Sequence, residues 1–137
     1  MTDPDEFFSR DTFARYSGIE CIKVSDGTAR VRMEIGDRHR NSHGTVHGGA
    51  LFTLADTAFA LASNSEGIPA AAINATITYM KAAREGTLYA EASEFSKNPK
   101  LATYIVTITD STGERIALFQ GMVYRKRVRN DQGDVTA

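Results

Sequence analysis

One apolar stretch constrains the fold of this chain more than any other, and it covers residues 46–64 with the sequence VHGGALFTLADTAFALASN. It contains no proline, and its apolar residues recur at spacings of three and four, which is the period of a helix. Apolar residues also occupy the opposite side, so the pattern predicts a helix buried in a domain. Asp56 in its middle argues against a membrane span, because an ionisable group at the centre of a bilayer is costly.

Asp56 is the residue of this predicted helix that most needs an explanation. A carboxylate among apolar side chains requires a partner or a chemical role. The structural alternative is a carboxylate held by the hydroxyl group of Thr53 or Thr57, or by a neighbouring element. The catalytic alternative is supported by desolvation, which would raise the pKa of Asp56 and make it a better general base.

The helix opens with Gly48 and Gly49, which let the backbone come close to a ligand. The first-turn amides of a helix are unpaired and lie at the positive end of its dipole, so they can hold a developing oxyanion. Gly48 and Asp56 are eight positions apart, or about 12 Å along a helix, too far to act on one carbonyl. Two antiparallel copies would join the two groups, which predicts a homodimer with shared active sites.

The motif NSHGTVHGG at residues 41–49, followed by LADTAFA at residues 54–60, resembles the PaaI-type (phenylacetate-pathway) hotdog-fold acyl-CoA thioesterases. The resemblance covers residues 18–126. It implies an α+β hotdog fold, in which an antiparallel sheet wraps around one long central helix. It also implies homodimers, often paired into homotetramers, and hydrolysis of small or aromatic acyl-CoAs such as phenylacetyl- or hydroxyphenylacetyl-CoA. No cofactor and no metal are implied.

The resemblance also implies roles for four residues. Asp56 matches the catalytic acid, and whether it acts as nucleophile or as general base toward water stays open. The Gly48 amide matches the oxyanion donor, and His47 supports that turn. Asn41 matches the side chain that orients the water or the carbonyl.

The candidate residues for binding the substrate or coenzyme A are Gly49, Thr57, Phe59, Asn74, Thr76, Lys81 and Arg84. Related enzymes often carry Ser or Thr on the strand after the helix, and here Asn74 or Thr76 would have to serve. A Phe-x-Arg-Pro pattern of the family is replaced by YMKA at residues 79–82. Lys81 and Arg84 are therefore candidates for the phosphates of coenzyme A, the alternative being a solvated strand end.

Phe59, Tyr79 and Met80 are candidates for an aromatic acyl pocket, although such residues more often form ordinary core. Gly49 and Thr57 adjoin the predicted oxyanion turn and the catalytic acid. The acyl group itself is not specified by these residues.

The rest of the chain predicts a short helix over residues 3–17 and then strands around the central helix. Phe7, Phe8, Phe13 and Tyr16 would pack the short helix on the body. Alternating patterns predict strands at 19–24, 29–35, 70–81, 87–96, 101–109 and 116–125. The domain plan is an N-terminal helical segment (1–17), a hotdog domain (18–126) and a flexible tail (127–137).

Three histidines, at positions 39, 43 and 47, follow one another at spacings of four. This spacing suggests metal ligands, but Gly44 interrupts the segment and no His-Glu-x-x-His pattern is present. We therefore expect no metal site. His39 and His43 are expected to be solvated loop residues.

Composition excludes several classes of partner. The net charge of −1 over 137 residues gives no basic surface for nucleic acid. Cys21 is the only cysteine, so no internal disulfide can form, which fits a reducing compartment. The first residues lack the basic start and apolar core of a signal peptide, so we expect a cytoplasmic protein without a membrane partner.

Two alternatives to a thioesterase remain. A hotdog-fold hydratase or dehydratase should show an Asp-x-Asn-Pro-x-His pattern, and DRHRN at residues 37–41 lacks the proline and the spacing. A non-catalytic acyl-CoA-binding protein should lack the catalytic acid and usually carries a DNA-binding extension. The presence of Asp56 favours the thioesterase.

Overall fold

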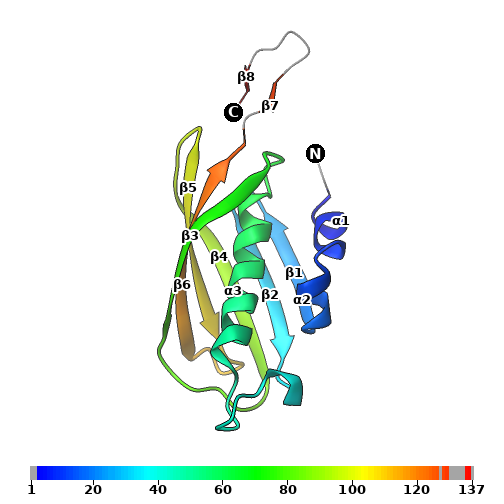
Figure 1. The fold of residues 1–137 in the computed structure, drawn as a ribbon, viewed down its shortest axis with the longest axis vertical. Coiled ribbons are helices and arrows are strands. Elements are labelled where there is room, and N and C mark those ends of the chain that lie inside the picture. Colours follow the sequence, from blue (N-terminus) through cyan, green and yellow to red (C-terminus); the bar gives the residue numbers. More distant parts are fainter. Residues whose placement is uncertain (1–2, 127, 130–134, 137) are drawn as a thin grey trace.

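The computed structural model describes residues 3–126, 128–129 and 135–136 (Figure 1). Two short helices come first, and one long helix lies between the second and third strands. The elements are α1 (Pro4–Ser9), α2 (Thr12–Tyr16), β1 (Ile19–Ser25), β2 (Thr28–Glu34), the 3₁₀ helix η1 (Asp37–His39), α3 (Gly48–Ser63), β3 (Ala70–Tyr79), β4 (Thr87–Lys97), β5 (Leu101–Thr109), β6 (Arg115–Arg125), β7 (Val128–Arg129) and β8 (Val135–Thr136).

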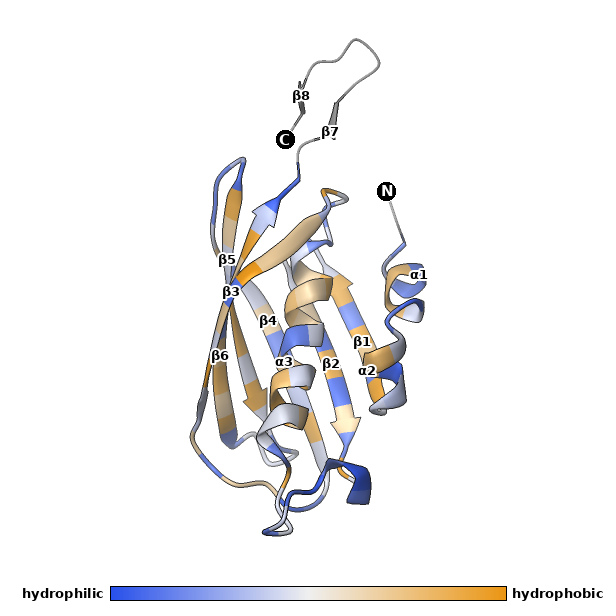
Figure 2. Cartoon of the chain, viewed as in Figure 1, coloured by the Kyte–Doolittle hydropathy of each residue, from blue (hydrophilic) through white to orange (hydrophobic). Residues whose placement is uncertain are grey.

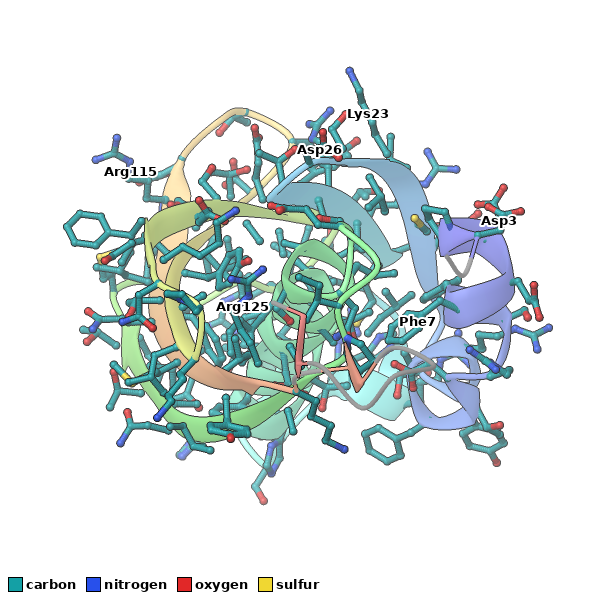
Figure 3. The ribbon with its side chains drawn as sticks, turned by 90° about the horizontal axis from the view of Figure 1, so that it is seen from above. Asp3, Phe7, Lys23, Asp26, Arg115 and Arg125 are labelled. Carbon is teal, nitrogen blue, oxygen red and sulfur yellow. The ribbon has the colours of Figure 1, made fainter. Side chains whose placement is uncertain are left out.

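The main sheet has six antiparallel strands in the order β1-β2-β4-β5-β6-β3. It curls around α3, which is seen nearly end-on in Figure 3. Hydrophilic and hydrophobic residues alternate along β2 (Figure 2), and this strand buries every second residue. The predicted α+β hotdog fold, with a sheet wrapped around one apolar helix, is therefore confirmed.

The core lies between α3 and the concave face of the sheet. Leu54, Ala55 and Ala58 of α3 have no exposed surface. Phe59 packs edge-on against Tyr104 and tilted against Phe119, with ring centroids 5.9 and 5.5 Å apart. The buried side chains of α3 thus fix its position across the sheet, and with it the positions of the groups on its other face.

Gly121 on β6 is the tightest point of this packing. A Cβ atom there would lie 2.6 Å from Cζ of Phe59, whose ring is buried. We expect Gly121→Ala to lower the free energy of unfolding by about 2 kcal/mol, because the ring has no free space to enter. Urea unfolding measures this loss. Phe59→Leu should lower the free energy of unfolding by less in the Gly121→Ala variant than in the native protein, because the smaller side chain relieves the clash. If the losses of the two substitutions simply add, the two residues are not in contact.

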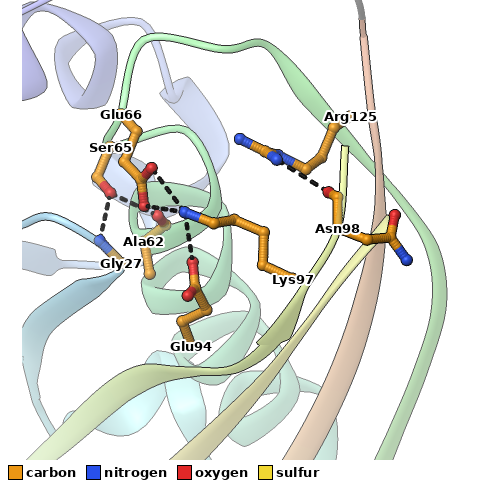
Figure 4. Close-up of polar contacts among 8 residues, drawn as sticks. All are labelled: Gly27, Ala62, Ser65, Glu66, Glu94, Lys97, Asn98 and Arg125. Atoms are coloured by element: carbon orange, nitrogen blue, oxygen red, sulfur yellow. Dashed lines mark hydrogen bonds and ion pairs between the residues drawn. The ribbon is translucent and has the colours of Figure 1, made fainter. Parts of the chain in front are cut away.

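Polar contacts hold the C-terminal end of α3 (Figure 4). Lys97 Nζ lies 2.9 Å from a carboxylate oxygen of Glu66 and 3.5 Å from one of Glu94, which ties the β4–β5 hairpin to the segment after α3. The amide of Gly27 donates to Ser65 Oγ at 2.9 Å. The side chain of Asn64 accepts from the amide of Ala70 at 2.9 Å, so the helix end is also joined to β3.

The N-terminal segment differs from the prediction of one helix. The chain forms α1 and α2, which lie beside β1 (Figure 1). Asp11 starts the second helix, because its side chain accepts from the amide of Ala14 at 3.0 Å. Phe7 and Phe8 pack against the core as expected. The expectation for Phe13 and Tyr16 was wrong, since they are 70% and 81% exposed.

The predicted flexible tail, residues 127–137, falls mostly outside the described residues. Its described parts, β7 and β8, pair antiparallel with each other.

Candidate active site

His47 caps the N-terminus of α3. Its Nδ1 accepts from the amide of Gly49 at 2.8 Å, and its carbonyl accepts from the amides of Ala50 and Leu51 at 2.9 and 3.2 Å. Among the hydrogen bonds of the described residues, none uses the N–H of Gly48. The two bonds to the His47 carbonyl polarise the peptide that carries this N–H. Gly48 therefore offers a strong free donor at the positive end of the helix.

A cavity of about 350 Å³ lies beside this donor. Its walls are mostly apolar, with a few polar groups, as in sites that bind small molecules. The lining residues are Asn41, Val46, Gly48, Leu51, Tyr79, Met80, Lys81 and Ala82. Three residues predicted for catalysis or coenzyme binding, Asn41, Gly48 and Lys81, are thus brought together in one cavity, and His47 adjoins it as the cap of the helix. Tyr79 and Met80, two of the candidates for an acyl pocket, line the same cavity.

Asn41 organises the loop that leads to α3. Its Oδ1 accepts from the amides of His43 and Thr45 at 2.9 and 3.2 Å. These two donors fix which side of the side-chain amide carries the oxygen. Nδ2 donates to Thr45 Oγ1 at 3.0 Å, and its second N–H has no partner in the described part of the chain. One donor of Asn41 therefore remains for a substrate or water.

Asp56 lies in the middle of α3 and does not line this cavity. Its side chain is half-buried, and burial raises its pKa, with a smaller contribution from the charge of Asp11 on the neighbouring N-terminal segment. The residues on the same side of the helix as Asp56 are exposed or half-buried, and they are Gly49, Thr53 and Ala60. Most residues on the other sides of the helix are buried. The acid thus stands on the open side of α3, away from the free amide of its own chain.

Three other predicted binding residues on α3 are engaged within the protomer. The N–H of Gly49 is used by His47. Thr57 is buried and donates to the carbonyl of Thr53 at 2.7 Å. Phe59 is buried against the sheet and belongs to the core rather than to an acyl pocket. None of these three residues lines the cavity.

Asn74 and Thr76 lie on the wrong face of β3 to meet the cavity. They pair with Met122 and Gln120, whereas the intervening Gly121 of β6 faces α3. Residues directly opposite in antiparallel strands share a face, so both candidates point to the outside of the sheet. The structure does not bring them to the site.

The two basic candidates differ from each other. Lys81 lines the cavity and forms an ion pair with Glu114. Arg84 is exposed and does not line the cavity, and its carbonyl accepts from Arg40 Nη2 at 2.9 Å. Lys81 is the better placed of the two for a ligand in this cavity.

The expectation that His39 is solvated was wrong, whereas His43 is exposed as expected. The Nδ1 of His39 accepts from the amide of Gly36 at 2.9 Å, so its proton lies on Nε2, which contacts the carbonyl of Ser17 at 2.6 Å. A buried imidazole needs both partners, and together they join the loop to the end of the N-terminal segment.

No group of three or more His, Cys, Asp or Glu side chains is arranged as metal ligands in the described ranges.

Tyr79 is the residue of the site whose contact the sequence did not reveal. Its hydroxyl donates to the carbonyl of Gly48 at 3.1 Å, and its ring lies against the Cα atom of the same glycine. A curled sheet around one helix, a free first-turn amide beside a cavity and an acid of raised pKa on the same helix are groups that hydrolysis of an acyl carbonyl requires.

Comparison with known proteins agrees with this chemistry. Residues 43–117 match the family model described as the thioesterase superfamily. The Escherichia coli acyl-coenzyme A thioesterase PaaI is 36% identical over 119 residues, which cover 86% of this chain and 85% of the relative. Human acyl-coenzyme A thioesterase 13 is 32% identical over 110 residues, covering 77% and 79%. The chain therefore belongs to the thioesterase superfamily.

Solved structures place the chain within this superfamily. The E. coli PaaI structure, from the phenylacetic acid degradation operon, superposes with a TM-score of 0.86 at 35% identity and covers 89% of each chain. A mutant structure of PaaI from Thermus thermophilus gives a TM-score of 0.80 at 38% identity, covering 83% of this chain and 98% of that one. The chain is thus a thioester hydrolase of the PaaI type with a hotdog fold.

None of its described helices is long and apolar enough to cross a membrane.

Proposed function

We propose that this protein hydrolyses small or aromatic acyl-CoA thioesters, with phenylacetyl- and hydroxyphenylacetyl-CoA among the candidates, at sites shared between two protomers. The free N–H of Gly48 beside the cavity is the observation that carries the proposal. It would hold the thioester oxygen of a substrate as negative charge develops. Asn41 would orient the carbonyl or the attacking water with its remaining N–H.

Asp56 of the other protomer would supply the attack. As a general base it takes a proton from water, whose oxygen adds to the thioester carbon before the carbon–sulfur bond breaks. As a nucleophile its own oxygen adds, the CoA thiolate leaves, and water then hydrolyses the mixed anhydride. In either case the products are the free acid and coenzyme A. A raised pKa supports both roles, because it makes the carboxylate more basic.

The homodimer is supported by the edge strand β3 and the open side of α3. β3 pairs with β6 on one side and has no strand on its other side within the described residues, and its Ile73 is 56% exposed. Pairing two such edges across a two-fold axis would continue the sheet and set the two α3 helices antiparallel. Gly48 of each protomer would then approach Asp56 of the other.

We further propose that two such dimers form a homotetramer. Leu118 and Tyr124 of β6 are 43% and 45% exposed on the outer face of the sheet, which supports a further contact there. A cytoplasmic location is supported by Cys21, which is a free thiol.

The test is release of free coenzyme A from a panel of thioesters, followed with a thiol reagent. The panel contains phenylacetyl-, hydroxyphenylacetyl-, benzoyl-, short-chain and long-chain acyl-CoA, and the Asp56→Asn variant is the blank. We expect fast hydrolysis of one class that the blank abolishes. Binding of these compounds without turnover of any of them would contradict the proposal.

A further inference from the structure

Tyr79 joins the end of β3 to the first turn of α3. Its hydroxyl donates to the carbonyl of Gly48 at 3.1 Å. Its ring covers the same residue closely, because a Cβ atom on Gly48 would lie 3.1 Å from both Cζ and Oη of Tyr79. A glycine at position 48 therefore has a structural reason besides ligand access: it leaves room for this ring.

The position of Tyr79 follows from the register of the sheet. It pairs with Ala117 of β6, which is buried beside α3, so its side chain points to the concave face. There it lines the cavity together with Gly48 and Asn41, while about half of its surface stays exposed. The ring is thus a wall of the cavity, and its hydroxyl reaches the backbone that presents the free amide.

The first turn of α3 needs such a constraint. A helix begins with residues whose amides lack partners, and it frays most easily there. Here the turn starts with two glycines, which are the least restricted residues. The cap by His47 restrains Gly49, and the bond from Tyr79 is the side-chain bond made to Gly48 among the described residues.

We propose that Tyr79 is a positioning residue of the thioesterase reaction, whose hydroxyl holds Gly48 so that its amide meets the thioester oxygen. This inference rests on the proposed function for its effect on turnover. The hydroxyl acts through Gly48, because it bonds the carbonyl of that residue and leaves the amide free for the substrate. The bond also links the strand edge proposed for dimerisation to the oxyanion turn.

The test compares Tyr79→Phe with the native protein. Phenylalanine keeps the ring against Gly48 and the wall of the cavity but removes the hydroxyl. We expect kcat for the best substrate of the panel to fall about tenfold, with KM nearly unchanged, because a lost hydrogen bond loosens the donor but not the cavity. Tyr16→Phe is the matched control, since Tyr16 of α2 is exposed and its hydroxyl has no partner among the described residues.

A second readout does not depend on the reaction. Hydrogen exchange of a peptide spanning residues 47–52 should be faster in Tyr79→Phe by about two- to fivefold, and unchanged in Tyr16→Phe. Native kcat in Tyr79→Phe, or a loss that appears only in KM, would overturn the positioning role. Unchanged exchange at residues 47–52 would overturn it as well. Failure of the proposed function would appear separately, as full turnover by Asp56→Asn or no turnover by the native protein.

Discussion

Replacing Asp56 with asparagine should lower kcat by about a thousandfold and leave the fold intact, because the amide is neither a base nor a nucleophile at neutral pH. Asparagine has the same shape, and Asp56 forms no side-chain hydrogen bond among the described residues that the change would break. Thiol release measures the loss, and circular dichroism measures the fold. A variant with more than a tenth of the native kcat would show that another group performs the attack.

The same variant should be more stable than the native protein at neutral pH. Burial, and secondly the charge of Asp11, raise the pKa of Asp56 in the folded state. The native fold therefore loses stability as pH rises from about 3.9, the ordinary pKa of the group, through its raised folded value. Asp56→Asn lacks this loss, so the difference in free energy of unfolding between the variant and the native protein, measured with urea, should shrink below about pH 4.

The same titration affects activity. For the native enzyme, kcat/KM should fall as the pH drops through the raised pKa of Asp56, because the protonated acid is neither a base nor a nucleophile.

Replacing Gly48 with proline should lower kcat/KM by about a hundred- to a thousandfold, because proline removes the N–H that we assign to the oxyanion. The backbone accepts this residue. Gly48 is the first residue of α3, where proline is favoured, and His47 before it is extended at φ −60° and ψ 137°. The melting temperature should therefore change little, and activity should be lost in a folded protein.

Gly48→Ala is the matched control for the added bulk. It keeps the N–H and places a Cβ atom 3.1 Å from the ring of Tyr79, as proline would. This ring is half exposed and can shift. We expect a loss of about tenfold for alanine, as for Tyr79→Phe, because a shifted ring gives up its hydrogen bond to Gly48 but the N–H remains. Equal losses in the two variants would show that bulk, and not the missing donor, is responsible.

Much of the fold could be predicted because periodicity in this chain is strong. The apolar run around Asp56 has the helical period, and α3 covers Gly48–Ser63 within the expected stretch. The six strands of the main sheet follow from alternation and turn residues, and their ends lie within two residues of the expected ranges. The break in the N-terminal segment was missed because Asp11 reads equally well as a helix residue and as the cap of a second helix.

The site was predicted less completely, for reasons that differ among residues. Alternation along β3 places Thr76 and Tyr79 on opposite faces of the strand. Which of the two faces is turned toward α3 depends on the pairing of β3 with β6, which the sequence pattern does not give. A register shift near Asn74 adds to this uncertainty of face. The burial of His39 depends on a carbonyl at Ser17, distant in sequence. The bond between Tyr79 and Gly48 likewise joins residues 31 positions apart, which no local pattern reveals.

The most direct test of the central claim mixes two inactive chains. Asp56→Asn and Gly48→Pro are co-expressed with different tags, and heterodimers are isolated through both tags. If each site joins the acid of one protomer to the amide of the other, one site per heterodimer is fully native, and about half of the native activity returns. If each chain carries its own complete site, every site has one defect, and the isolated heterodimers stay as inactive as their parents.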